Sequence, residues 1–120
     1  MKIVLAAVFI FGFLLAQLQC CNLAECIDEY APVCGFNHFS HKKLKFRNRC
    51  FLAQHNLCEG TSFSLANMLC CTLQCPKDDS PVCGYDQSNH QAQTFDSDCY
   101  LYLHNACYRT NFMPDKRNLC

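Results

Sequence analysis

The most abundant residues with reactive side chains in this 120-residue chain are its 13 cysteines, which can form disulfides or bind metal ions. That share exceeds the roughly 8–10 % that is typical of disulfide scaffolds. Cysteines in this number form disulfides in an oxidising compartment, whereas the cytosol would keep them as thiols. A zinc site is not favoured, because no two cysteines are separated by two residues, the usual zinc-ligand spacing. We therefore expect disulfides, with no bound metal and no cofactor.

The other polar residues are not arranged for catalysis. No Ser-His-Asp set or pair of carboxylates stands out, and a fully cross-linked chain has no thiol to act as a nucleophile. Ten basic and ten acidic side chains cancel, which disfavours nucleic acid as a partner. We expect a monomer that binds other proteins and is not an enzyme.

The first 20 residues have the pattern of a secretory signal peptide. One positive charge at Lys2 precedes an apolar run over residues 3–16. A helix of that length reaches about 21 Å, too short for a bilayer core of about 30 Å. Cleavage after Ala16 or after Cys20 fits the small-residue requirement, and cleavage after Cys20 leaves an even number of cysteines. The sequence predicts a secreted, extracellular protein with no membrane span.

The remainder of the chain is an internal repeat. A shift of 49 residues superimposes six cysteines and the motif Pro-Val-Cys-Gly. Chance does not preserve six spacings, so we infer a tandem duplication, with a first unit over 21–70 and a second over 71–120. Sequence alone leaves open whether Cys71 closes the first unit and Cys70 opens the second, or the reverse. The superimposed cysteines are Cys21, Cys26, Cys34, Cys50, Cys58 and Cys71, which fall on Cys70, Cys75, Cys83, Cys99, Cys107 and Cys120.

Each unit is too small to be held by apolar burial alone, so cross-links worth about 3–4 kcal/mol each must substitute for a core. Asn48 and Ser97 are good N-cap residues, and they predict helices over 50–58 and 99–107. Phe46 and Phe95 lie in short runs that are typical of hairpin strands. The segment from Cys26 to Cys34 should be an extended, exposed loop. One helix against a two- or three-stranded sheet is expected in each unit.

These residues resemble the Kazal family of serine protease inhibitors. The resemblance lies in CIDEYAPVCGFN (26–37) with FRNRCFL (46–52), and in CPKDDSPVCGYD (75–86) with TFDSDCYL (94–101). It implies a small disulfide-rich α+β fold with two Kazal-like domains, each one short helix on a small antiparallel sheet. The wide spacing between the third and fourth cysteines is closer to nonstandard Kazal-like domains, such as those of follistatin-type and vasotab-like secreted proteins. Family connectivity implies the pairs Cys21–Cys58, Cys26–Cys50, Cys34–Cys71, Cys70–Cys107, Cys75–Cys99 and Cys83–Cys120.

The resemblance also implies a function. In the family, the loop after the second cysteine enters a serine protease as a substrate would, and the residue two places after that cysteine selects the enzyme. In the second unit this residue is Lys77, between Pro76 and Asp78. A lysine suits a specificity pocket with a carboxylate at its base, as in trypsin-like enzymes. The sequence therefore predicts inhibition of an extracellular trypsin-like serine protease through Lys77.

The first unit carries Asp28 at the corresponding position, between Ile27 and Glu29. An unpaired carboxylate is costly in most such pockets, so this unit should inhibit common proteases poorly. The family braces its loop with an asparagine, which the first unit has as Asn48 and the second replaces with the shorter Ser97. These departures support an alternative function as a non-inhibitory secreted ligand, resembling vasotab-like modulators, of a channel, receptor or matrix component.

A basic run is the strongest charge difference between the units. We expect it to form an exposed loop, which makes it a candidate for binding polyanions, although such a run is more often simply a solvated loop. The five basic residues are Lys42, Lys43, Lys45, Arg47 and Arg49.

Overall fold

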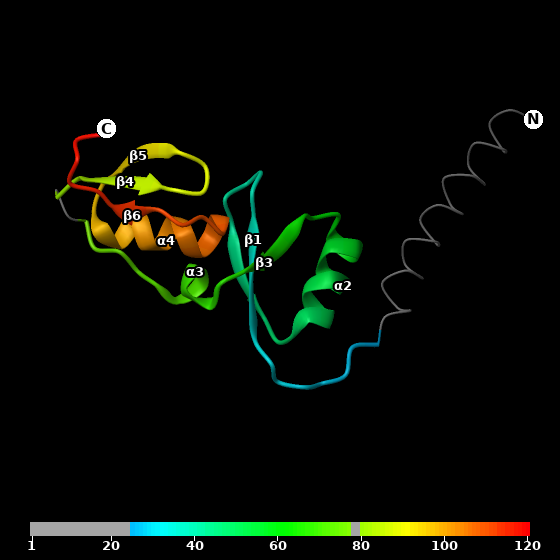
Figure 1. Ribbon diagram of the computed structural model, residues 1–120. Coiled ribbons are helices and arrows are strands. Elements are labelled where there is room, and N and C mark those ends of the chain that lie inside the picture. Colours follow the sequence, from blue (N-terminus) through cyan, green and yellow to red (C-terminus); the bar gives the residue numbers. More distant parts are fainter. Residues whose placement is uncertain (1–24, 78–79) are drawn as a thin grey trace, which may run out of the picture.

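A computed structural model describes residues 25–77 and 80–120 (Figure 1). The predicted signal peptide, Cys21 and Asp78 lie outside these ranges. Among the described residues, no helix has both the length and the apolar character needed to cross a bilayer.

The first unit is a three-stranded antiparallel sheet with one helix. The central strand β1 (Val33–Asn37) pairs with β2 (Lys43–Phe46) on one side and with β3 (Phe63–Ala66) on the other. Helix α2 (Arg49–Glu59) connects β2 to β3. We call this set of elements unit 1.

The second unit repeats this arrangement. Strand β4 (Val82–Asp86) lies between β5 (Gln91–Phe95) and β6 (Met113–Pro114), again antiparallel, and α4 (Asp98–Tyr108) is the helix. We call this set unit 2. The predicted fold class, two small Kazal-like α+β domains, is confirmed. A short helix between the units, α3 (Met68–Thr72), was not predicted.

Both long helices begin at the capping residues that the sequence indicates. The Asn48 side chain accepts a hydrogen bond from the Phe51 N–H at 3.2 Å, and the Ser97 hydroxyl accepts one from the Tyr100 N–H at 3.4 Å. Each cap satisfies a backbone donor of the first turn, which has no partner inside the helix. The caps therefore fix where each helix starts relative to the strand before it.

The glycine of each Pro-Val-Cys-Gly motif lies against a phenylalanine ring. A Cβ on Gly84 would come within 2.7 Å of Phe95 Cε2, and one on Gly35 within 2.7 Å of Phe46 Cε2. Both rings are buried in the small cores of their units, next to Leu101 and Leu52. The motif therefore requires glycine because the helix and the adjacent strand pack directly onto the backbone of the central strand.

A four-residue hydrogen-bond network explains the histidine and asparagine that recur in the two helices. In unit 2, Asn105 donates to the Phe112 carbonyl and accepts from the Phe112 N–H, both at 2.9 Å. The Thr110 hydroxyl donates to the Asn105 oxygen at 2.8 Å, so it must accept from Nδ1–H of His104, 3.0 Å away. The network ties the end of the helix to the following strand.

Unit 1 has the same network. Its members are His55, Asn56, Thr61 and Phe63, with distances between 2.8 and 2.9 Å. The two histidines are therefore structural in both units.

Substitution of Gly84 by alanine tests the close approach in unit 2. The added Cβ must displace the buried Phe95 and Leu101 side chains, so Gly84→Ala should lower the free energy of unfolding by about 1–3 kcal/mol. Denaturant titration measures this loss. The control is Asn89→Ala in the exposed β4–β5 turn, and equal stability of the two variants would contradict the packing argument.

The environment of His104 predicts an acid-sensitive stability. Its ring stacks on Tyr108 at a centroid distance of 4.4 Å and contacts Phe95 and Phe112 edge-on, and burial lowers its pKa. The unfolded chain then binds a proton more readily, so stability is complete above about pH 6.5 and falls as the pH decreases below it. Unfolding titrations at pH 7.5 and pH 5.5 should show a smaller loss in His104→Gln than in the natural chain. Equal losses would contradict this assignment.

The disulfides settle the pairing at the junction between the units. The Cα atoms of Cys34 and Cys71 are 5.7 Å apart, and those of Cys70 and Cys107 are 4.8 Å apart. Cys71 therefore closes unit 1 and Cys70 opens unit 2, so the two cross-links overlap in the sequence. The disulfides between described residues are Cys26–Cys50, Cys34–Cys71, Cys70–Cys107, Cys75–Cys99 and Cys83–Cys120, all of them pairs that the family connectivity implies.

The remaining implied bond joins Cys58 to Cys21. Cys58 is disulfide-bonded, but its expected partner lies outside the described residues.

The two units share a buried cluster around this junction. It contains Cys34, Phe36, Cys70, Ala106 and Cys107, each at most 6 % exposed. Figure 1 shows α3 close to both α4 and the sheet of unit 1. At the edge of the cluster, His41 Nδ1 lies 2.7 Å from the Tyr108 hydroxyl. The units are therefore packed against each other, which the sequence did not predict.

Candidate functional site

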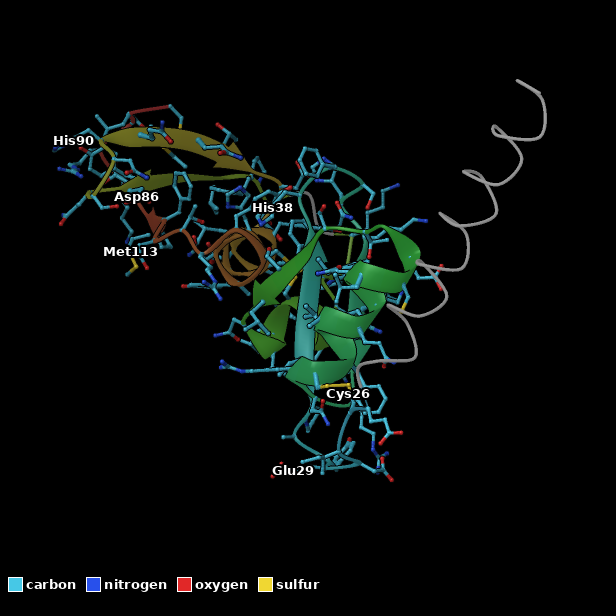
Figure 2. All side chains as sticks on the ribbon, turned by 90° about the vertical axis from the view of Figure 1, so that its right-hand side faces the viewer. Cys26, Glu29, His38, Asp86, His90 and Met113 are labelled. Carbon is cyan, nitrogen blue, oxygen red and sulfur yellow. A yellow bond between two sulfur atoms is a disulfide. The ribbon has the colours of Figure 1, made fainter. Side chains whose placement is uncertain are left out.

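The loop that follows Cys26 projects from unit 1 into solvent. Ile27 and Tyr30 are 81 % and 72 % exposed, and the Asp28 side chain is 80 % exposed. Figure 2 shows Glu29 at the tip of this loop, beyond the labelled Cys26. We call residues 27–30 loop 1. Its side chains are available to a partner without any rearrangement of the sheet.

Loop 1 is held from beneath by Asn48. The side-chain amide donates to the carbonyls of Ile27 at 3.0 Å and Glu29 at 2.8 Å, while its oxygen caps α2. Asn48 is itself buried. The two carbonyls on either side of Asp28 are therefore fixed to the helix start. This is the bracing that the family resemblance implies for an asparagine at this position.

Two further links restrict loop 1. The Cys26–Cys50 disulfide joins its first end to α2, and the Ala31 N–H donates to the Arg47 carbonyl at 3.0 Å at its other end. A loop tied at both ends and in the middle has already lost much of its conformational entropy, so binding it costs less.

Arg47 provides a charged contact to the tip of the loop. Its Nε lies 2.5 Å from Asp28 Oδ1, and its guanidinium carbon lies 5.5 Å from the centre of the Tyr30 ring. Both charged side chains are substantially exposed, so this ion pair contributes little to stability, about 0–1 kcal/mol. The pair was not predicted from the sequence, in which Arg47 is only one member of the basic run.

The corresponding loop of unit 2 contains Pro76 and Lys77, both exposed. We call residues 76–80 loop 2, of which 78 and 79 are outside the described residues. The Cys75–Cys99 disulfide anchors its first end to α4. The Ser97 hydroxyl caps α4, but it makes no hydrogen bond to the described residues of loop 2. Loop 2 thus has the lysine that the prediction requires, without the asparagine brace seen in unit 1.

The basic run does not form the exposed loop that was expected. Lys43 and Lys45 lie on strand β2, because the run pairs with β1 to complete the hairpin. Arg47 forms an ion pair with Asp28, and Arg49 is the first residue of α2. The five basic side chains are therefore distributed over a strand, a connection and a helix, and polyanion binding by them stays a prediction.

A buried carboxylate stabilises unit 2 away from the loops. Asp86 is 1 % exposed and accepts from the hydroxyl and N–H of Ser88 and from the Asn111 N–H. The Ser88 hydroxyl and these backbone donors hold the pKa of Asp86 below its ordinary value, against burial, which raises it. No group of three or more metal-ligating side chains occurs in the described ranges.

The sequence was compared with models of known protein families. The family described as Kazal-type serine protease inhibitor domain matches residues 19–69 and again residues 70–118. The chain belongs to this family. No curated protein and no solved structure gives a significant match. The two matched segments contain one loop each, so we refer to units 1 and 2 as Kazal domains 1 and 2.

Replacement of Asn48 by serine separates helix capping from loop bracing. Serine caps the equivalent helix of domain 2 but is too short to reach the carbonyls of Ile27 and Glu29. We expect Asn48→Ser to keep the helix cap, to lower the free energy of unfolding by about 1–3 kcal/mol through the loss of two hydrogen bonds of about 0.5–1.5 kcal/mol each, and to increase amide hydrogen exchange in residues 26–32. The matched control is Asn67→Ser, which changes the cap of α3. Unchanged exchange in loop 1 would show that Asn48 does not brace it.

Proposed function

We propose that this protein is a secreted inhibitor of trypsin-like serine proteases and that domain 2 binds the enzyme through Lys77. The observation that supports the proposal is the exposed position of Lys77 in a loop that a disulfide anchors. It is exposed, two residues after a cysteine whose disulfide anchors the loop to α4. A lysine presented in this way fills a specificity pocket that has a carboxylate at its base.

Secretion is part of the proposal. The disulfides need an oxidising compartment, and residues 1–20 have the composition of a signal peptide. Under this proposal the mature chain begins near Cys21, acts outside the cell as a monomer and performs no catalysis of its own. Its partner is an extracellular protease.

A second candidate function is supported by Ser97. Ser97 makes no hydrogen bond to the described residues of loop 2, and a serine stands where domain 1 has the asparagine that braces loop 1. A loop of this kind suits a protein that has the Kazal fold but binds a channel, receptor or matrix component through another surface. Under this alternative, Lys77 is a solvated side chain and its substitution has no effect on activity.

The pair Lys77→Ala and Ser97→Asn tests the inhibitor proposal. Lys77→Ala should abolish inhibition of trypsin, because it removes the group that enters the pocket. Ser97→Asn should tighten inhibition about tenfold, because two added hydrogen bonds of about 0.5–1.5 kcal/mol each would brace the loop. Inhibition constants measure both effects, and Lys116→Ala, on the exposed C-terminal segment, is the matched charge control.

Failure of the natural chain to inhibit a panel of trypsin-like proteases at micromolar concentration would overturn the proposal. If the protein acts on another target and Lys77→Ala leaves that activity unchanged, the alternative function as a non-inhibitory ligand replaces the inhibitor proposal.

A further inference from the structure

We propose that domain 1 is a second inhibitory head, directed at serine proteases that cleave after aspartate, with Asp28 as its specificity residue. This inference rests on the proposed function, because it assigns loop 1 the same mode of binding as loop 2. The partner it predicts differs, since its specificity pocket must contain a cationic group.

The first argument is the order of loop 1. The carbonyls before and after Asp28 are both fixed by Asn48, and the Cys26–Cys50 disulfide and the Ala31–Arg47 hydrogen bond hold the two ends. The Asp28 side chain nevertheless remains 80 % exposed. A rigid backbone that presents one exposed side chain is what a substrate-like inhibitor requires. More links hold the backbone of loop 1 than hold the described part of loop 2, so loop 1 is better ordered for binding.

The second argument is that the Asp28 carboxylate pairs with a cationic group. In the free protein its carboxylate is paired with the guanidinium of Arg47. An enzyme pocket with a cationic side chain offers the same kind of partner, so the carboxylate exchanges one positive group for another. Because the ion pair with Arg47 is exposed, breaking it costs little, at most about fivefold in affinity. A pocket without a cation leaves the charge buried and unpaired, which excludes enzymes of other specificity.

The third argument comes from the duplication. The shift of 49 residues places Asp28 on Lys77 and Arg47 on Asp96. The charge of the specificity residue and the charge of its neighbour are therefore both reversed between the domains. All four side chains are exposed, so packing imposes no charge at these positions. Reversal of both signs is the pattern expected if the two loops serve pockets of opposite charge.

The experiment uses the full secreted chain with Lys77→Ala, which removes the proposed inhibition by domain 2. This variant is assayed against granzyme B, a serine protease that cleaves after aspartate, and against a glutamyl endopeptidase. We expect inhibition of one or both enzymes at micromolar concentration or below. The added change Asp28→Asn keeps the shape but removes the charge, and it should weaken inhibition by at least about thirtyfold. Glu59→Gln, at the exposed end of α2 opposite Asn48, is the matched control and should retain inhibition.

A second variant distinguishes failure of this inference from failure of the proposed function. Asp28→Lys in the Lys77→Ala background should gain inhibition of trypsin, because the braced loop would then present a lysine. If this variant inhibits trypsin but the natural loop inhibits neither acid-specific enzyme, the inference is overturned and the inhibitory mode stands. If it does not inhibit trypsin, loop 1 is not an inhibitory loop and the inference is also overturned. Inhibition of trypsin by the natural chain tests domain 2 independently.

Discussion

The arrangement of this protein depends on two adjacent cysteines in one short helix. Successive residues of an α-helix point about 100° apart, so Cys70 and Cys71 leave α3 in different directions. Cys70 bonds to Cys107 of α4, and Cys71 bonds to Cys34 of β1. Each cross-link closes one domain, and the helix that carries both cannot move independently of either. The buried cluster around these bonds, which includes Phe36 and Ala106, follows from this constraint.

Rigid attachment of the domains also determines what the loops can do. Loop 1 projects from the end of domain 1, with Glu29 at its tip, away from the elements of domain 2 (Figure 2), and the described residues of loop 2 directly precede β4. No described residue of either loop takes part in the shared cluster. A partner on one loop therefore need not disturb the contact between the domains. Disulfides hold each loop to the start of a helix, which lets a domain with very little core present an ordered binding segment.

Local signals in the sequence predicted the parts of the fold that local physics determines. The N-caps Asn48 and Ser97 marked the helices correctly, and cysteine spacing revealed the repeat. The packing between the domains was not predictable, because it depends on side chains far apart in the sequence, such as His41 and Tyr108, that only the folded chain brings together. The hairpin strand expected around Phe46 is present as β2, but Lys43 and Lys45 were assigned to an exposed loop because their charges concealed the pairing with β1. The contact of Asp28 with Arg47 was missed for a similar reason. These residues are far apart in the sequence, and only the hairpin brings them together.

The two copies differ at the residues that form the contact between the domains, and this difference has a physical reason. The contact between them is head to tail, so it buries one face of domain 1 and a different face of domain 2. On the helix of domain 2 the contact uses Ala106 and Tyr108, and the equivalent residues of α2 are the exposed Leu57 and Glu59. On the sheet of domain 1 it buries Phe36, whose equivalent Tyr85 instead contacts Arg117 of the C-terminal segment. Each domain therefore carries the residues of this contact on one face only, because Leu57, Glu59 and Tyr85 do not reproduce Ala106, Tyr108 and Phe36.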